Sequence, residues 1–231
     1  MLDDLDSNET MIARFEALGL DPRRPLLVCD ADGVLIEFAR PLAGFLERCG
    51  LALEFESFAL AGNIRKKACG SPLTKEEIAP LILAFLEEEV DRPALLEGAA
   101  EAISRLRAHL SLIVLTNIPH ALRERRERAF NRLGLDVPVF SNQGGKGTLV
   151  KRFSAAHHAP VIFIDDLPLQ HRSVAEHAPH VHRIHMVGEP SLARLIDRAA
   201  DCQYRCDLWA DCADLVLELL SSETHCGLRQ S

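Results

Sequence analysis

Four short apolar segments, each followed by polar residues, constrain the fold of this chain more than any other feature. A segment that is apolar on both faces is typical of a strand buried in a parallel sheet, although a short apolar run alone is also compatible with a helix. Strands that alternate with helical stretches predict an α/β protein with a parallel sheet and right-handed crossovers. The segments are 26–29, before Asp30; 112–115, before Thr116; 137–140, before Ser141; and 161–164, before Asp165; the helical stretches between them are 97–109, 119–133 and 147–157.

The ends of the chain extend the same alternation. Residues 8–19 have helical spacing and end at Gly19. Residues 181–187 predict a fifth strand, and 190–199 a helix after it. Trp209 and a helix around 211–220 are expected to pack into the core.

Residues 36–95 interrupt the alternation, because their pattern is helical throughout. The predicted helices are 41–48, 54–68 and 74–89, and Thr74 and Glu77 have the spacing of a capping box at the start of the last one. We therefore expect an all-helical insert over 36–95 and a Rossmann-like α/β core formed by 1–35 and 96–231.

Charge and hydropathy argue against two classes of partner. The chain has 26 Lys and Arg against 34 Asp and Glu, a net charge of −8, which disfavours nucleic acid. No apolar run approaches the roughly 20 residues of a membrane span. An acidic N-terminus and an odd number of cysteines, seven, predict a cytoplasmic protein with reduced thiols. The oligomeric state is left open.

Carboxylates gather where the predicted strands end. Asp30 and Asp32 follow the first strand, and Asp165 and Asp166 end a separate one. Open α/β sheets place their sites at this edge. A carboxylate can attack phosphorus, and a second carboxyl can protonate the leaving group. If these acids converge, a divalent cation would relieve their repulsion, and hard oxygen ligands favour Mg²⁺ over zinc.

Three further residues are suited to holding a phosphoryl group. Thr116, beside Asn117 at another strand end, offers a hydroxyl and nearby amides. Lys146, in Gly144–Gly147, offers a cation that can bridge a nucleophile and a phosphate. Phosphoryl transfer needs little more than positioning, charge neutralisation and an in-line nucleophile.

This set resembles the four motifs of the haloacid dehalogenase superfamily, over about residues 25–190. The first motif is similar to Asp30-Ala31-Asp32-Gly33-Val34 and the second to the strand that ends in Thr116. The third is similar to Lys146 at the start of a helix, and the fourth to Asp165-Asp166. The insert falls at the family's first cap position.

The resemblance implies a role for each motif residue. Asp30 would form an aspartyl-phosphate, and Asp32 would be the general acid and base. Asp30, the backbone carbonyl of Asp32, and Asp166 would bind Mg²⁺, with Asp165 as a second or water-bridging partner. Thr116, Asn117 and Lys146 would hold the phosphoryl group.

The spacing of the third and fourth motifs departs slightly from the family pattern. Lys146 precedes Asp166 by only 20 positions, and Lys151 is a competing but less favoured lysine in the middle of the helix. The second acid of the first motif argues against a dehalogenase. The implied activity is therefore a Mg²⁺-dependent phosphatase acting on a small phosphorylated metabolite.

Other functions stay open. A phosphomutase would return the phosphoryl group to the bound intermediate, and a phosphate-binding protein would keep the fold without turnover. Phosphonate hydrolysis is less favoured, since Lys66, Lys67 and Lys75 are only formal candidates for a Schiff base. Sugar phosphates, nucleoside monophosphates and phospho-amino acids are all possible substrates.

Two clusters have both a functional and a plain interpretation. Asn63, Arg65 and Lys66 form a cationic group in the insert, which is a solvated face by default but would meet an anionic substrate if the cap turns it inward. The spacing of the C-terminal histidines and cysteines fits no strong zinc pattern, so a structural zinc site is not favoured. These residues are His180, His182, His185, Cys202, Cys206, Cys212, His225 and Cys226.

Overall fold

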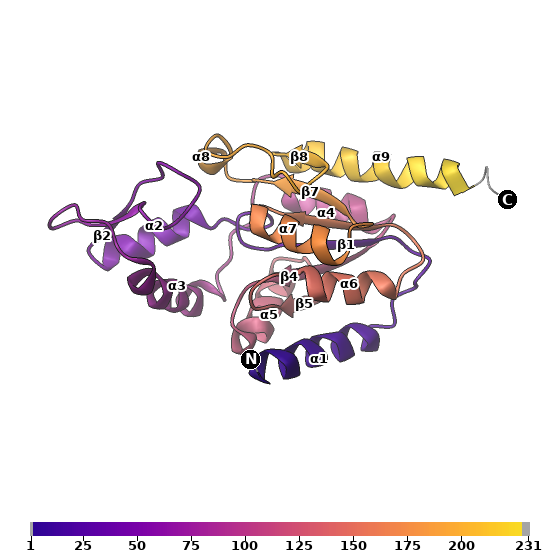
Figure 1. The fold of residues 1–231 in the computed structure, drawn as a ribbon, viewed down its shortest axis with the longest axis horizontal. Helices are drawn as coiled ribbons and strands as arrows, with labels where there is room; N and C mark the ends of the chain where they lie inside the picture. The colour runs from indigo at the N-terminus through magenta and orange to yellow at the C-terminus, as the bar shows by residue number, and fades with distance from the viewer. Residues whose placement is uncertain (1, 228–231) are drawn as a thin grey trace.

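The four apolar segments form neighbouring parallel strands of one sheet, as the sequence predicts. The computed structural model describes residues 2–227, and the side chains of 8–222 within them. The six strands lie in the order β5-β4-β1-β6-β7-β8, and every pair is parallel (Figure 1). They are β1 (Leu26–Cys29), β4 (Ser111–Thr116), β5 (Val139–Ser141), β6 (Val161–Asp165), β7 (His182–Met186) and β8 (Tyr204–Cys206).

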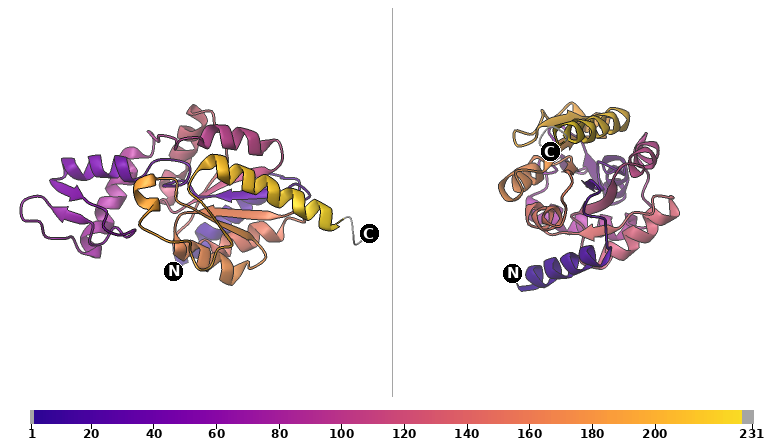
Figure 2. Two further views of the ribbon diagram at one scale, coloured as in Figure 1. Left: turned by 90° about the horizontal axis from the view of Figure 1, so that it is seen from above. Right: turned by 90° about the vertical axis from the view of Figure 1, so that its right-hand side faces the viewer.

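Helices cover both faces of the sheet, and β1 has apolar side chains on both faces to pack against them. Leu27 and Cys29 pack in the cluster that includes residues of α4 and α9, whereas Leu26 and Val28 pack in the cluster of α1, α6 and α7. Figure 2 shows α1 and α9 on opposite sides of the sheet. The helices of the core are α1 (Leu2–Ala17), α4 (Ala99–Arg107), α5 (Arg123–Arg132) after the 3₁₀ turn η1 (His120–Leu122), α6 (Gly147–Ala155), α7 (Pro168–His177) and α9 (Trp209–Gly227).

Residues 36–95 leave the sheet after β1 and project beyond the ends of the strands (Figures 1 and 2). They contain α2 (Ala39–Arg48), the antiparallel pair β2 (Leu51–Leu53) and β3 (Ile64–Lys66), and α3 (Lys75–Glu89). The predicted capping box is present, with Thr74 Oγ1 accepting from Glu77 N at 3.3 Å and Glu77 Oε2 accepting from Thr74 N at 2.9 Å. The apolar cluster of the insert includes Leu42, Phe45 and Phe85, and Ile118 and Leu122 of the core belong to the same cluster.

The predicted helix over 54–68 is wrong, so the insert is not all-helical. Leu53 pairs with Ile64 and Leu51 with Lys66, and the loop between these strands turns at Gly62, whose φ is +90°. The buried side chain of Asn63 supplies the loop's missing hydrogen bonds. Its Oδ1 accepts from Glu56 N at 3.0 Å, and its Nδ2 donates to Ser57 O at 2.7 Å. Such side-chain bonds stabilise a loop at the expense of a helix.

The C-terminal third differs from prediction in three places. β7 confirms the fifth strand, but the helix expected over 190–199 is a single turn, α8 (Pro190–Ala193). Strand β8 was not predicted, because it has three residues and lies at the sheet edge, where no apolar run is needed. The last helix starts at Trp209 and is longer than expected.

Hydrogen bonds tie two parts of the chain after β7 to the chain that follows β1. Glu189, which follows β7, accepts hydrogen bonds from Phe38 N at 2.9 Å and Ala39 N at 3.0 Å, where α2 begins. Trp209 Nε1 donates to Val34 O at 2.8 Å. None of the helices in the described part of the chain has the length and apolarity that a bilayer span requires.

Candidate active site

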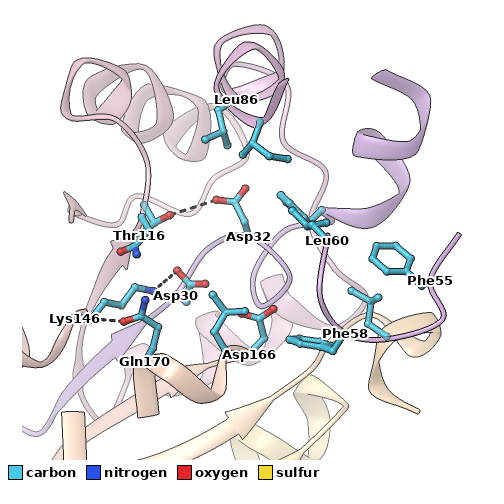
Figure 3. Close-up of a pocket in the computed structure, with 15 residues that line it drawn as sticks. Asp30, Asp32, Phe55, Phe58, Leu60, Leu86, Thr116, Lys146, Asp166 and Gln170 are labelled. Atoms are coloured by element: carbon cyan, nitrogen blue, oxygen red, sulfur yellow. Dashed lines mark hydrogen bonds and ion pairs between the residues drawn. The ribbon is translucent and has the colours of Figure 1, made fainter. Parts of the chain in front are cut away.

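The sheet order brings the polar strand ends together. β1 lies between β4 and β6, so Asp30, Thr116 and Asp165 leave three adjacent parallel strands at the same edge. Topology therefore gathers residues that are more than 130 positions apart in the sequence, from Asp30 to Asp165 and Asp166. Figure 3 shows the side chains of Asp30, Thr116 and Asp166 around one cavity.

A tight turn after β1 carries Asp32 back over the site. Ala31 O accepts hydrogen bonds from Leu35 N at 2.8 Å and Ile36 N at 3.0 Å. Gly33 has φ +83°, and a Cβ there would lie 2.9 Å from Asp166 Oδ2. Two features therefore require glycine at position 33: the positive φ and the closeness of the Asp166 carboxylate.

Lys146 is fully buried between two carboxylates. Its Nζ lies 2.5 Å from Asp30 Oδ1 and 2.6 Å from Asp165 Oδ2. Burial alone would lower the pKa of Lys146, but the charges of Asp165 and Asp30 outweigh it and raise the pKa, so the ammonium is retained. Lys151, the competing lysine, is exposed on α6 and does not line the cavity.

The acids of β1 and β6 form a cluster with an excess of negative charge. Carboxylate oxygens of Asp30, Asp165 and Asp166 lie within 4.8 Å of one another, and all three residues are buried. Burial, with Asp165 as a further cause, raises the pKa of Asp30 to about 7, and burial also raises that of Asp166. Two full charges at this spacing repel by about 3 kcal/mol at an effective dielectric near 20.

The cluster fits a divalent cation with oxygen ligands, such as Mg²⁺. Both oxygens of Asp165 already have partners, since Oδ2 contacts Lys146 and Oδ1 accepts from Leu167 N at 2.9 Å. Among the described residues, the Asp166 carboxylate has no salt bridge. These contacts favour Asp166 over Asp165 as a direct metal ligand. The side chain of Asp32 lies outside the cluster.

Asp32 is held by two other groups. Thr116 Oγ1 donates to Asp32 Oδ2 at 3.3 Å, and Arg126 contacts Asp32 Oδ1 at 3.3 Å. Arg126 is 2% exposed, and among the described residues its Nε has no hydrogen-bond partner. Sequence reasoning missed Arg126, because it lies in an arginine-rich helix where nothing marks the one that turns inward.

Two side chains secure the loop before Lys146. Gln170 Oε1 accepts from Lys146 N at 2.8 Å, and Asn117 Nδ2 donates to Gly144 O at 2.8 Å. Asn117, predicted to bind phosphate, lines the cavity but also has this structural role. Gln170 was not predicted and carries no sequence signal.

The cavity beside these groups has a volume of about 230 Å³. One half is polar and includes Asp30, Asp32, Asp166, Thr116 and Lys146. The insert forms much of the other half with apolar side chains only: Phe38, Phe55, Phe58, Leu60, Ile82 and Leu86.

The structure does not bring Asn63, Arg65 and Lys66 to the cavity, which corrects the expectation for the insert. Asn63 is buried in its own loop, Lys66 Nζ pairs with Glu77 at 2.9 Å on the surface, and Arg65 bonds to Gly70 O at 3.4 Å. Because 54–68 contains the loop after β2 and strand β3 instead of a helix, apolar residues of the loop reach the cavity.

The C-terminal histidines and cysteines are dispersed among the described residues. His185 Nε2 donates to Asp166 O at 2.8 Å and its Nδ1 accepts from Ala199 N at 3.1 Å. His180 contacts Ser154 Oγ at 3.2 Å. Asp30, Asp165 and Asp166 are the one set of three potential metal ligands found where side chains are described, and the side chains of His225 and Cys226 lie outside that part.

Comparison with known proteins gives matches at the level of structure. No protein-family model and no curated protein matches the sequence significantly. A haloacid dehalogenase-like protein of unknown function from Agrobacterium tumefaciens is 16% identical, with a TM-score of 0.60, over 84% of this chain and 98% of its own. A HAD family hydrolase from Deinococcus radiodurans, with bound phosphate and sodium, is 17% identical, with a TM-score of 0.57, over 86% and 97%.

A further match is a mutant of CbbY from Rhodobacter sphaeroides in complex with xylulose-1,5-bisphosphate. It is 17% identical, with a TM-score of 0.51, over 80% of this chain and 94% of its own. The parallel sheet of this chain and the insert after its first strand agree with the resemblance seen in the motifs. The matched structures also cover most of the chain. The chain has the fold of the haloacid dehalogenase superfamily.

Proposed function

We propose that this protein is a Mg²⁺-dependent phosphatase that hydrolyses a small phosphorylated metabolite through an aspartyl-phosphate on Asp30. The observation that carries the proposal is the position of two carboxylates in one cavity. Asp30 lies against Lys146 beside the acid cluster, and Asp32 lies against Thr116 and Arg126. The odd number of cysteines, seven, is the reason to propose a cytoplasmic location.

The proposed reaction has two steps. In the first, the free oxygen of Asp30 attacks phosphorus, the ester P–O bond breaks, and Asp32 gives its proton to the departing alcohol. In the second, water attacks the phosphorus of the aspartyl-phosphate, Asp32 takes the proton from that water, and phosphate leaves. Lys146 keeps Asp30 in place throughout, and Thr116 orients Asp32.

The proposed metal would be held by Asp30 and Asp166, with the backbone carbonyl of Asp32 as the third ligand that the resemblance implies. Bound Mg²⁺ would neutralise charge on the phosphoryl oxygens. Without such a cation the acid cluster would repel a phosphate dianion, because Lys146 is already paired with two carboxylates.

Residues 36–95 are proposed to act as a cap domain on a core formed by 1–35 and 96–231. Their apolar cluster is separate from the two clusters of the sheet, and their side chains close one wall of the cavity. Opening of the cap would admit substrate, and closure would exclude water from the phosphoryl group before the second step.

The apolar wall favours hydrolysis over the phosphomutase alternative. A mutase holds a bisphosphate, whose second phosphoryl group needs cations or hydrogen-bond donors. The side chains that the insert places on the cavity are all apolar. The proposal is therefore a hydrolase, although one matched structure binds a sugar bisphosphate.

Phosphate release from a broad set of phosphorylated metabolites, with and without Mg²⁺, tests this function. We expect release that needs Mg²⁺ and is lost in Asp30→Asn. Asp214→Asn is the matched control, since its carboxylate pairs with Arg105 on the surface. If folded wild-type protein binds Mg²⁺ but releases no phosphate, or if Asp30→Asn is as active, the proposal is wrong.

A further inference from the structure

The cavity described above pairs a phosphoryl site with an apolar chamber. The carboxylates, Thr116 and Lys146 line one end, and side chains from the insert line the other. In Figure 3, Phe58 and Leu60 lie beside Asp166 and Asp32, with Phe55 further from the carboxylates. Leu167, just before α7, and Leu192, in α8, extend the apolar lining. We infer that the alcohol half of the substrate is apolar and about the size of a six-carbon ring; this inference rests on the proposed phosphatase function.

The polar side chains of the insert have partners elsewhere. Lys66 pairs with Glu77 and Lys67 with Glu47, both on the surface, and Asn63 is used within its loop. Arg48 lies 2.5 Å from Glu88 and is exposed. A hydroxyl group placed between Phe58, Leu60 and Leu86 would therefore lose its hydrogen bonds to water without gaining a replacement from these side chains. Burial of an unpaired hydroxyl is unfavourable, so a sugar moiety fits this chamber poorly.

The size of the cavity limits the substrate. A cavity of about 150 Å³ lined by Leu, Ile and Phe accepts benzene. The cavity here is about 230 Å³, which leaves room for a ring of that size and for phosphoryl oxygens next to the carboxylates. A nucleoside or a long acyl chain would exceed it unless the insert opens.

Contacts between the insert and the core leave part of the insert's apolar surface uncovered. Phe55 and Phe58 contact the cluster of Ala39, Val187 and Leu192, which joins the insert to the loop after β7. Ile82 and Leu86 come from α3 and pack in the cluster that joins the insert to Ile118 and Leu122 of the core. Both groups line the same cavity, so contacts between the insert and the core leave a hollow with apolar walls.

A pair of esters with one ring skeleton tests the inference. Cyclohexyl phosphate and myo-inositol 1-phosphate are both phosphate esters of a secondary ring alcohol, but the second has a hydroxyl on every remaining carbon. In the presence of Mg²⁺, we expect kcat/KM of the wild-type protein to be about 100-fold higher for cyclohexyl phosphate, because buried unpaired hydroxyls are costly. Equal values, or a preference for the inositol ester, would overturn the inference and leave the phosphatase proposal intact.

A matched pair of variants locates the preference in the chamber. Leu60→Asn places an amide on the wall, and we expect it to reduce the ratio of the two kcat/KM values about 10-fold. Leu83→Asn makes the same change on α3 at a side chain that is 44% exposed and does not line the cavity, so it should leave the ratio unchanged. An unchanged ratio in folded Leu60→Asn would contradict the inference.

Binding separates the two proposals. Asp30→Asn is expected to hold both esters without turnover, so calorimetric titration in Mg²⁺ measures their affinities directly. Tighter binding of cyclohexyl phosphate supports the apolar chamber even if the wild-type protein hydrolyses neither ester, a result that would count against the phosphatase alone. Equal binding of both esters, or binding of neither, would overturn the inference.

Discussion

Arg126 is a buried cation with few partners. It contacts Asp32 at 3.3 Å, its guanidinium lies 5.9 Å from the centre of the Phe130 ring, and within the described residues its Nε is unsatisfied. A charge is costly to bury unless it is paired, so its burial next to the proposed general acid points to a positioning role.

Replacement of Arg126 should affect turnover more than substrate binding. In Arg126→Met, Asp32 loses one of its two side-chain partners, and small errors of position lower rates by about 10- to 100-fold. We expect kcat to fall by that factor with KM nearly unchanged, and Arg126→Lys to recover part of the loss. Arg128→Met is the control, because Arg128 is exposed on the same helix. An unchanged kcat in folded Arg126→Met would show that Thr116 alone positions Asp32.

His185 makes the stability of the protein depend on pH. Burial lowers its pKa to about 4, and Nδ1 must stay unprotonated to accept from Ala199 N. The unfolded chain takes up the proton near its ordinary pKa of about 6.5, so stability falls as the pH drops from about 6.5 towards 4. Between pH 7 and pH 5 we expect a loss of about 1–2 kcal/mol from this group.

Chemical denaturation of the wild-type protein and His185→Gln at both pH values isolates this effect from that of other groups. The variant should be less stable at pH 7, but its additional loss on acidification should be smaller by the amount above. Parallel pH dependences of the two proteins would mean that His185 contributes nothing to acid sensitivity.

The N-terminus of helix α2 is capped by a hydrogen-bond acceptor, Glu189, that lies 150 positions after Ala39 in the sequence. Its N-cap residue, Phe38, has no side chain that can accept a hydrogen bond, and the buried carboxylate of Glu189 accepts from Phe38 N and Ala39 N instead. The first N–H groups of a helix need such partners. Glu189 therefore connects the insert to the loop after β7.

Loss of the Glu189 acceptor should loosen the insert. We expect Glu189→Ala to lower the free energy of unfolding by about 1–2 kcal/mol, as for the loss of a capping side chain. Burial raises the pKa of Glu189, whereas its hydrogen bonds from Ala39 N and Phe38 N lower it. Glu189→Gln keeps an acceptor and should retain most of the stability in denaturant titrations; a loss as large as that of Glu189→Ala would mean that the charge is essential.

Elements with a strong local pattern were predictable from the sequence, whatever their length, and elements without one were not. Strands β1, β4 and β6 are continuous apolar runs, and helix α3 carries its own capping box. In contrast, 54–68 had helical spacing but contains strand β3 and the loop before it, which Asn63 stabilises. Contacts within the fold outweighed local propensity there, as they commonly do in short segments.

Over the whole molecule, the acid cluster should couple metal binding to stability. A ligand that binds only the folded state at 100 times its Kd adds about 2.7 kcal/mol. We expect Mg²⁺ to raise the melting temperature, and EDTA to reverse the rise. Because the pKa of Asp30 is about 7 without metal, protons compete for this carboxylate at lower pH, so the shift should shrink as the pH falls below 7.

Asp166→Asn provides the decisive comparison for metal binding. It removes one of three crowded, buried carboxyl groups, so without Mg²⁺ it should be at least as stable as the wild-type protein, but its Mg²⁺-dependent increase should be lost. Asp214→Asn, on the surface, should behave as the wild type does. A wild-type melting temperature that does not respond to Mg²⁺ would contradict a magnesium site at these residues.

The convergence of the motif acids and Lys146 could be predicted because their types and their order along strand ends signal chemistry. The positions of Arg126, Gln170 and the apolar wall could not, since they reach the candidate site only through contacts between distant segments. Arg126 is one of five arginines in α5, and Phe58 lies in a segment expected to be a helix. Such positions depend on which face of an element turns inward, and the sequence pattern did not determine this.

The hydrogen bond from Trp209 to Val34 has a consequence for how the protein is made. The turn that carries Asp32 is completed by a residue 175 positions later in the chain. During synthesis, the first motif therefore leaves the ribosome long before its last support exists. A nascent chain has to keep β1 unpaired or loosely paired until β4, β6 and finally α9 have emerged, so the turn that carries Asp32 is complete only after Trp209 has been translated.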